Sequence, residues 1–331
     1  RRAFDRLLAS LNAENVLSIR AAMAENGAGG DHWRLLDYAW GAVDPAGAIA
    51  HLPDVPERYR DGFLGNILPG WASKDPRGAI NYLEGMEAGQ ARDRMTGRLL
   101  EGLADHDLGV ATRYLFQLAD SGDKNAGRHI DTLARDVLKV EGLEGARSWA
   151  EELPTGDIQG AALDRVAHQL VANSPENAAR WASQYAGQDY AWRVIEEVGD
   201  EWAERDPSSA VAWLDDLPDG RGRTEGMRSA LGEWAKKDAV AAGDYLLEMP
   251  ESPAKDAAVS GFSRNLAWKD PVTAIQWAES ISSKGARIQA LTQVGQAWSH
   301  RNKAAATKWA QNSGLPEKVQ QAIMNPPGHR R

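Results

Sequence analysis

The sequence contains no cysteine, and this absence excludes several kinds of chemistry. None of its 331 residues can form a disulfide, act as a thiolate nucleophile or bind a metal through sulfur. Lack of cysteine suits exported bacterial proteins, and the sequence opens with Arg1-Arg2 instead of an initiator methionine. We therefore expect a bacterial, periplasmic protein from which a leader has been removed, although the composition also fits a cytoplasmic location.

Long apolar segments and an excess of basic residues are missing too. No run approaches the roughly 18 apolar residues that indicate a membrane-spanning helix. Asp and Glu number 47 against 38 Lys and Arg, which gives a net charge of −9. Non-specific binding to a phosphate backbone needs a basic face, so we do not expect nucleic acid among the partners.

What the sequence does contain is a pattern that returns along nearly the whole chain. It reads W/L-A-x-x-D-P-x-x-A-x-x-W, and successive copies begin 31, 32, 35, 32, 32, 32, 32 and 32 residues apart. The first residues of the copies are Trp40, Trp71, Leu103, Leu138, Leu170, Trp202, Trp234, Leu266 and Trp298. Such periods are typical of proteins whose units bury their apolar faces by stacking on their neighbours.

Each copy predicts two helices joined by a short turn. In one unit, Asp206 is placed to cap a first helix that opens with Pro207 and runs to about residue 217. Pro218 and the glycines after it end that helix, and a second helix follows over about residues 223–237. A similar reading at the C-terminus predicts a last helix over about residues 316–324.

An alanine is present in every complete copy, and three residues later the side chain is large and usually aromatic. The alanines are Ala48, Ala79, Ala111, Ala146, Ala178, Ala210, Ala242, Ala274 and Ala306. The larger residues are His51, Tyr82, Tyr114, Trp149, Trp181, Trp213, Tyr245, Trp277 and Trp309. A small residue lets two helices approach closely, so we interpret both positions as packing rather than as a carbohydrate-binding platform.

The helical hairpin, the Asp-Pro opening and the recurring alanine resemble tetratricopeptide-type repeats and, more loosely, Sel1 and HEAT-like repeats. The sequence departs from the tetratricopeptide pattern in its 32-residue spacing and in its tryptophan. The resemblance implies that extended peptides or partner proteins bind along a concave surface lined by the first helices, and it implies a scaffold rather than an enzyme.

From the period we predict an all-α protein, an α-solenoid of about ten helix-turn-helix repeats of ~32 residues that forms a curved superhelix. Residues 1–331 are predicted to be a single domain. Within it, residues 1–39 form a worn capping unit, residues 40–315 the regular repeats, and residues 316–331 a capping helix and tail.

The sequence gives little sign of catalysis or of metal and cofactor binding. None of the seven histidines belongs to an HExxH or His-x-His pair, so we expect no metal and no cofactor. We interpret His168 as a partly exposed helix residue and His51 as a packed one. The acids of Glu196-Glu197 point about 100° apart on a helix, so we expect them not to converge. In the loop Gly27–Gly30, Asp31 is expected to cap the following helix.

The first-helix position two residues after the alanine lies about 200° around the helix from it, and so should leave the packed seam. Its residues vary in charge, as the lining of a specific groove would. The candidate binding residues are Asn81, Arg113, Arg180, Asp244, Gln276 and Lys308.

The first functional hypothesis is thus a non-enzymatic scaffold that binds a protein or peptide along its first helices. The second is an α/α-toroid enzyme acting on a polysaccharide or prenyl substrate, which the nearly equal loops disfavour. The third is a self-assembling structural component of the cell envelope, joined through its end units.

Overall fold

The computed structural model describes residues 7–326, and every regular element within them is helical. This confirms the all-α class. None of the helices in that range is long and apolar enough to cross a bilayer. The chain divides into two compact units, residues 1–146 (unit 1) and residues 147–331 (unit 2), and each is described by itself. Whether the chain behaves as one domain stays a prediction.

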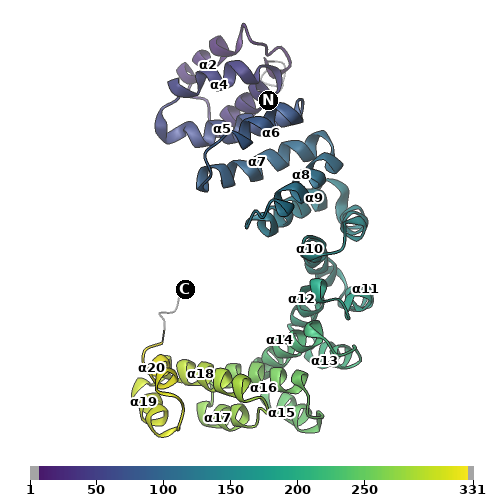
Figure 1. The fold of residues 1–331 in the computed structure, drawn as a ribbon, viewed down its shortest axis with the longest axis vertical. Helices are drawn as coiled ribbons and strands as arrows, with labels where there is room; N and C mark the ends of the chain where they lie inside the picture. The colour runs from purple at the N-terminus through teal and green to yellow at the C-terminus, as the bar shows by residue number, and fades with distance from the viewer. Residues whose placement is uncertain (1–6, 327–331) are drawn as a thin grey trace. The chain divides into compact units, whose positions relative to one another are not determined.

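Unit 1 alternates longer and shorter helices (Figure 1). Its elements are α2 (Val16–Glu25), α3 (Gly30–Val43), α4 (Pro45–His51), η1 (Leu52–Asp54), α5 (Glu57–Ala72), α6 (Pro76–Glu84), α7 (Gln90–His106), α8 (Leu108–Asp120) and α9 (Ala126–Glu152). Helix α9 continues past the end of the unit and is interrupted at Gly142, whose φ of 70° is not helical. This break stands where other copies have Asp-Pro.

Unit 2 continues the alternation. Its elements are α10 (Asp157–Asn173), α11 (Pro175–Ala182), η2 (Ser183–Tyr185), η3 (Asp189–Ala191), α12 (Trp192–Ala203), α13 (Pro207–Asp215), α14 (Arg221–Lys237), α15 (Ala239–Glu248), α16 (Pro253–Leu266), α17 (Pro271–Glu279), α18 (Lys284–Arg301), α19 (Lys303–Asn312) and α20 (Glu317–Met324). The last helix lies where the sequence predicts it.

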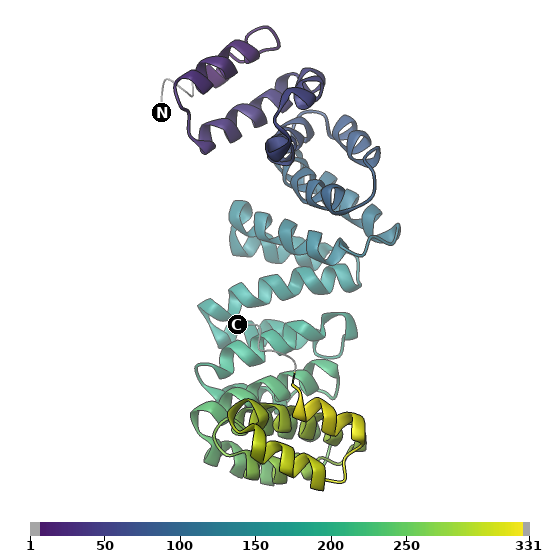
Figure 2. The same cartoon turned by 90° about the vertical axis from the view of Figure 1, so that its left-hand side faces the viewer.

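The helices of unit 2 form two layers. The long helices α10, α12, α14, α16 and α18 each pack against the next long helix, and we call them the long row. The shorter helices α11, α13, α15, α17 and α19, the short row, pack mainly on the long helices that flank them. Figure 1 shows α11 and α13 on one side of the long helices, and Figure 2 shows successive helices stacked one below another. In unit 1, α3, α5 and α7 pack on one another in the same way and form its long row.

The Asp-Pro pairs begin helices as predicted. In each case the aspartate accepts a hydrogen bond from the backbone N–H three residues later, at a distance of 3.0–3.2 Å, and proline occupies the first turn. The four pairs open α4, α6, α13 and α17, with Asp44, Asp75, Asp206 and Asp270 as caps. A cap of this kind stabilises a protein by about 1 kcal/mol.

The predicted cap at Asp31 is wrong. Helix α3 begins two residues earlier than that prediction allows, with Gly29 at the N-cap and Asp31 inside the first turn. Glycine is itself a favourable N-cap residue, so Gly29 takes the position predicted for Asp31. An acidic residue in the first turn still interacts favourably with the positive end of the helix.

The recurring alanine and aromatic positions form the interior seam. All nine alanines are fully buried, at 0% exposure. Where both aromatic positions are filled by rings, the two rings contact each other at centroid distances of 5.3–6.2 Å. The pairs are Trp40–His51, Trp71–Tyr82, Trp202–Trp213, Trp234–Tyr245 and Trp298–Trp309. Of these rings only Trp40 is fully buried, so most of the indoles keep one edge near solvent.

The long helices approach most closely at glycines, which the sequence analysis did not single out. A Cβ atom on Gly70 of α5 would overlap the carbonyl oxygen of Tyr38 on α3. Likewise, a Cβ atom on Gly261 of α16 would overlap the carbonyl oxygen of Arg228 on α14. The backbones therefore touch at these crossings, and no residue larger than glycine fits there without separating the helices.

Basic side chains connect successive long helices of unit 2. Arg205, Lys237, Lys269 and Arg301 each donate to backbone carbonyls at or just after the C-terminal end of the preceding long helix. For Lys269 the acceptor is Lys236 O, at 2.9 Å. Because carbonyls at a helix end lack partners within the helix, a cation placed there stabilises it.

Candidate functional site

The residues proposed from the sequence all reach the surface and are divided between the two units. Each lies on a different helix of a shorter kind, and each is exposed. They are Asn81 on α6, Arg113 on α8, Arg180 on α11, Asp244 on α15, Gln276 on α17 and Lys308 on α19. Their predicted exposure is confirmed, whereas their role in binding stays a prediction.

Of these residues, Gln276 lines a groove between α15 and α17. The groove has a volume of about 330 Å³, and its apolar lining includes Leu246, Val259 and Trp277. Leu247 also lines it and is 68% exposed. The groove therefore offers an apolar surface to solvent between two helices of the short row.

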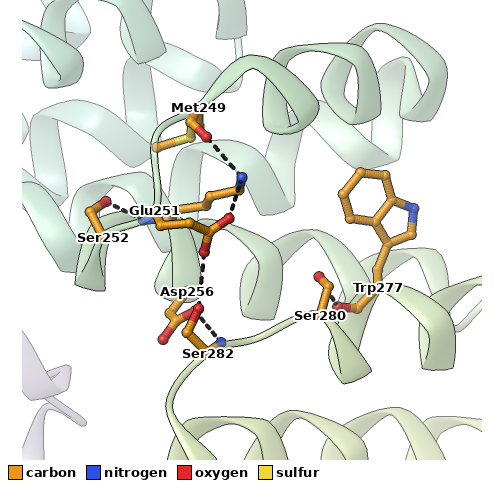
Figure 3. A network of polar contacts seen from close by, with 8 residues as sticks. Met249, Glu251, Ser252, Asp256, Trp277, Ser280 and Ser282 are labelled. Carbon is orange, nitrogen blue, oxygen red and sulfur yellow. Dashed lines mark hydrogen bonds and ion pairs between the residues drawn. The ribbon is translucent and has the colours of Figure 1, made fainter.

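A polar network includes three residues that line this groove, Glu251, Lys255 and Asp256 (Figure 3). Lys255 Nζ donates to Met249 O and to Glu251 Oε1, both at 2.8 Å, and Ser282 Oγ donates to Glu251 Oε2 at 2.9 Å. The hydrogen bonds from Lys255 and then Ser282 hold the pKa of Glu251 below its usual value. Asp256 accepts from the backbone N–H groups of Ser282 and Ser283. These partners already satisfy the charged groups, so we interpret the network as a clamp between two loops.

A larger groove, of about 570 Å³, crosses the long helices of unit 1. Its lining comes from α3, α5, α7 and the first half of α9. Charged residues of both signs line it: Arg34, Arg98, Lys139, Glu101, Asp105, Asp136 and Glu141. Leu35 and Val140, which are 43% and 73% exposed, add apolar surface. The groove is thus amphipathic and open to solvent.

Two acids of this groove have partners. Glu101 accepts from Arg98 Nη1 at 2.6 Å, and Asp105 accepts from the Tyr38 hydroxyl at 3.2 Å. Arg98 also donates through Nε to the carbonyl of Gly65 at 2.9 Å, which fixes its side chain across two helices. Burial raises the pKa of Glu101, although the nearby Arg98 guanidinium acts in the opposite direction.

The third acid, Asp136, lacks a partner at one of its oxygens. Its Oδ2 atom is buried and accepts no hydrogen bond. Burial raises the pKa of this carboxyl, while Lys139 and Arg135 oppose that effect and Asp105 adds to it. A buried carboxylate oxygen without a donor is unfavourable, so a cationic group bound beside this carboxyl would stabilise its charge.

In unit 2 the long row brings a histidine and two glutamates together. His168 lies on α10, and Glu197 and Glu201 lie one turn apart on the neighbouring α12. His168 Nδ1 contacts Glu197 Oε1 directly and lies 4.0 Å from Glu201 Oε1. The three donor atoms all lie within 4.8 Å of one another. This arrangement can hold a cation or share a proton.

Further carboxylates surround this cluster. Burial and then Glu197 raise the pKa of Asp164 to about 6, and burial and then Glu233 raise the pKa of Asp200 to about 6. Glu196 turns the other way and accepts from Ser229 Oγ at 2.9 Å. The prediction that Glu196 and Glu197 do not converge is therefore confirmed.

Sequence reasoning missed the cluster because it looked for histidine and carboxylates close together in the chain. His168 precedes Glu197 by 29 residues, which is close to the 32-residue period. Residues separated by about one period lie on neighbouring long helices, so a search at that separation would have paired His168 with the Glu197/Glu201 turn. As predicted, His168 is a partly exposed helix residue, with a side chain that is 50% exposed.

Comparison of the chain with protein-family models, with curated proteins and with solved structures gives no match in any of the three. The functional argument therefore depends on the geometry of these sites alone.

Proposed function

We propose that this chain is a non-enzymatic α-solenoid of about ten helix-turn-helix units that binds a protein or peptide partner. Support comes from the capped Asp-Pro helix starts, the fully buried alanines and the packing of each long helix of unit 2 on the next. In such arrays each unit contacts only its neighbours, which leaves an extended surface for recognition.

The groove across α3, α5, α7 and α9 is the site that we propose for the partner. The single observation that carries this assignment is the buried Asp136 Oδ2 atom, which has no donor. Asp105 lies near enough to raise the pKa of Asp136 further, although Lys139 and Arg135 act on this carboxyl in the opposite direction. A lysine or arginine side chain of a partner would supply both the donor and the opposite charge.

The apolar residues that line the groove indicate which other side chains the partner presents. Leu35 and Val140 remain largely exposed although they line the same groove. Covering them would remove apolar surface from water and favour binding. We therefore propose a segment that presents a basic residue next to aliphatic residues.

The shorter helices of the two units give a second location for the same function. The candidate residues of unit 1 are Asn81 on α6 and Arg113 on α8, and those of unit 2 are Arg180, Asp244, Gln276 and Lys308 on helices of the short row. All of them are exposed and they differ in charge, which suits a specificity surface. Binding measurements on variants at each of the two locations distinguish between them.

The test is selection of peptides from a random displayed library against the full chain, followed by calorimetric titration of the selected peptides. We expect enrichment of peptides with Lys or Arg beside Leu, Ile or Val. Asp136→Asn should weaken their binding roughly tenfold or more, because a hydrogen bond to a charged group contributes about 1.5–3 kcal/mol.

The matched control is Asp120→Asn, at the exposed end of α8 in the same unit, which should leave binding unchanged. Loss of binding in Arg113→Ala and Asn81→Ala, with Asp136→Asn unaffected, would place the partner on α6 and α8, the shorter helices of unit 1. Failure of the library to yield any specific peptide would contradict the scaffold proposal.

A further inference from the structure

The cluster of His168, Glu197 and Glu201 has the donor set of a metal centre, and we propose that it binds one divalent transition-metal ion such as Zn²⁺. One imidazole nitrogen and two carboxylate oxygens already lie within 4.8 Å of one another. The proposal concerns unit 2 and does not depend on the peptide site of unit 1.

The helices place the ligands where one ion can reach all three. Glu197 and Glu201 are four residues apart on α12, so both project from the same side of that helix. His168 faces them from α10, which packs directly on α12. Zinc bonds to nitrogen and oxygen are about 2.0–2.2 Å long, so ligands around one ion lie about 3–4 Å apart. The 4.0 Å between His168 Nδ1 and Glu201 Oε1 is already in that range.

The surrounding charge also favours a cation. Asp164 lies one turn before His168 on α10, and Asp200 lies between the two glutamates on α12. Arg165 and Arg193 are the basic groups that act on Asp164. Four carboxylates therefore accompany one imidazole, and a doubly charged ion would relieve the repulsion between them.

The imidazole decides which class of metal fits. Mg²⁺ and Ca²⁺ prefer a shell of oxygen atoms alone, whereas Zn²⁺ and its first-row neighbours accept imidazole together with carboxylates. The side chains of His168, Glu197 and Glu201 are 50%, 26% and 32% exposed, so solvent reaches the cluster. Three protein ligands and access for water describe an open site rather than a closed structural one.

The test is calorimetric titration of the full chain, without any affinity tag, with ZnCl₂, MnCl₂ and MgCl₂ in separate experiments. We expect one Zn²⁺ per chain, weaker binding of Mn²⁺ and no binding of Mg²⁺. His168→Ala and Glu197→Gln should each lower the Zn²⁺ affinity by roughly tenfold or more, since loss of even an outer-shell partner typically has an effect of that size.

The matched control is His300→Ala, which removes a histidine from α18 that stacks on Trp268 and lies outside the cluster. This variant should keep the wild-type affinity. Circular dichroism of each variant shows whether it remains folded, which the partial exposure of His168 leads us to expect. Absence of stoichiometric Zn²⁺ binding, or binding that His168→Ala leaves unchanged, would overturn the proposal and leave the cluster as an ion pair.

Discussion

Asp136 illustrates at the scale of one residue how binding and stability can oppose each other. Its buried Oδ2 atom has no donor, and burial raises the pKa of the carboxyl. The folded state is therefore destabilised by the ionised form. Residues retained at such a disadvantage are frequently those that a protein uses for binding.

Asp136→Asn should consequently raise the free energy of unfolding at pH 7, because it removes the charge that burial disfavours and keeps the size of the side chain. The raised pKa gives the sign of the pH dependence. Above the folded-state pKa the variant keeps its full gain in unfolding free energy over the wild type. This gain vanishes below the ordinary aspartate pKa of 3.8, where the wild-type carboxyl is protonated in both the folded and the unfolded state. Urea denaturation of the variant and the wild type at pH 7 and at about pH 3.5 measures this difference. A variant that is less stable at pH 7 would contradict the argument.

Gly70 gives a second prediction for a single residue. Gly70→Ala should lower stability by about 1–3 kcal/mol, because the new methyl group must push α5 away from the Tyr38 carbonyl on α3. Urea denaturation measures the change. Gly97→Ala on α7 is the matched control, since a Cβ atom added there would meet no other group within 4 Å. That control should be neutral or gain up to about 1 kcal/mol from helix propensity.

The element scale is where the sequence was most informative. Helix starts depend on local chemistry, so Asp206-Pro207 and Asp270-Pro271 could be identified without knowledge of neighbours. The buried alanines could be identified for the same reason, from their fixed place in each copy. The prediction for Asp31 was wrong because Gly29, which is also a favourable N-cap residue, lies two residues before it and takes the cap position.

Asp270 tests this local chemistry. Hydrogen bonds from Thr273, through its side chain and its backbone, hold the pKa of Asp270 below its usual value. Such a group stabilises the folded state above the unfolded-state pKa, and this contribution is lost as the pH falls through the folded-state pKa. Asp270→Ala should therefore destabilise the protein by about 1 kcal/mol at pH 7 and by less at pH 3. Thermal denaturation at the two pH values measures the difference, and Asp270→Asn should retain most of the cap.

The scale of the whole molecule shows why the candidate sites escaped the sequence. The unit 1 groove and the His168 cluster both combine side chains from different long helices. A single copy of the pattern does not say which residues of the next copy it faces. The sequence analysis also searched the first helices, where side chains are exposed but separated from one another, whereas the long helices are the ones that pack side by side.

Since packing contacts join neighbouring helices, we expect the effect of a substitution to remain within one helix and its neighbours. Gly261→Ala should separate α16 from α14, where the two backbones touch. In the repeat array that we propose, each unit contacts only its neighbours, so hydrogen exchange should accelerate in these helices and those beside them, while amides of unit 1 keep their rates. Mass spectrometry of exchange in the variant and the wild type measures this. Uniform acceleration along the chain would show instead that the protein unfolds as one cooperative body.

The basic side chains of unit 2 make contacts that are asymmetric along the chain, because each one donates to carbonyls of a preceding helix. Arg205, Lys237, Lys269 and Arg301 each donate to carbonyls at or just after the end of an earlier long helix, so the C-terminal ends of α10, α12, α14 and α16 rely on residues that are synthesised later. A substitution that disturbs one long helix should therefore destabilise the preceding long helix more than the following one. During translation, the C-terminal end of the most recently synthesised long helix would stay frayed until the basic side chain of the next one binds its carbonyls.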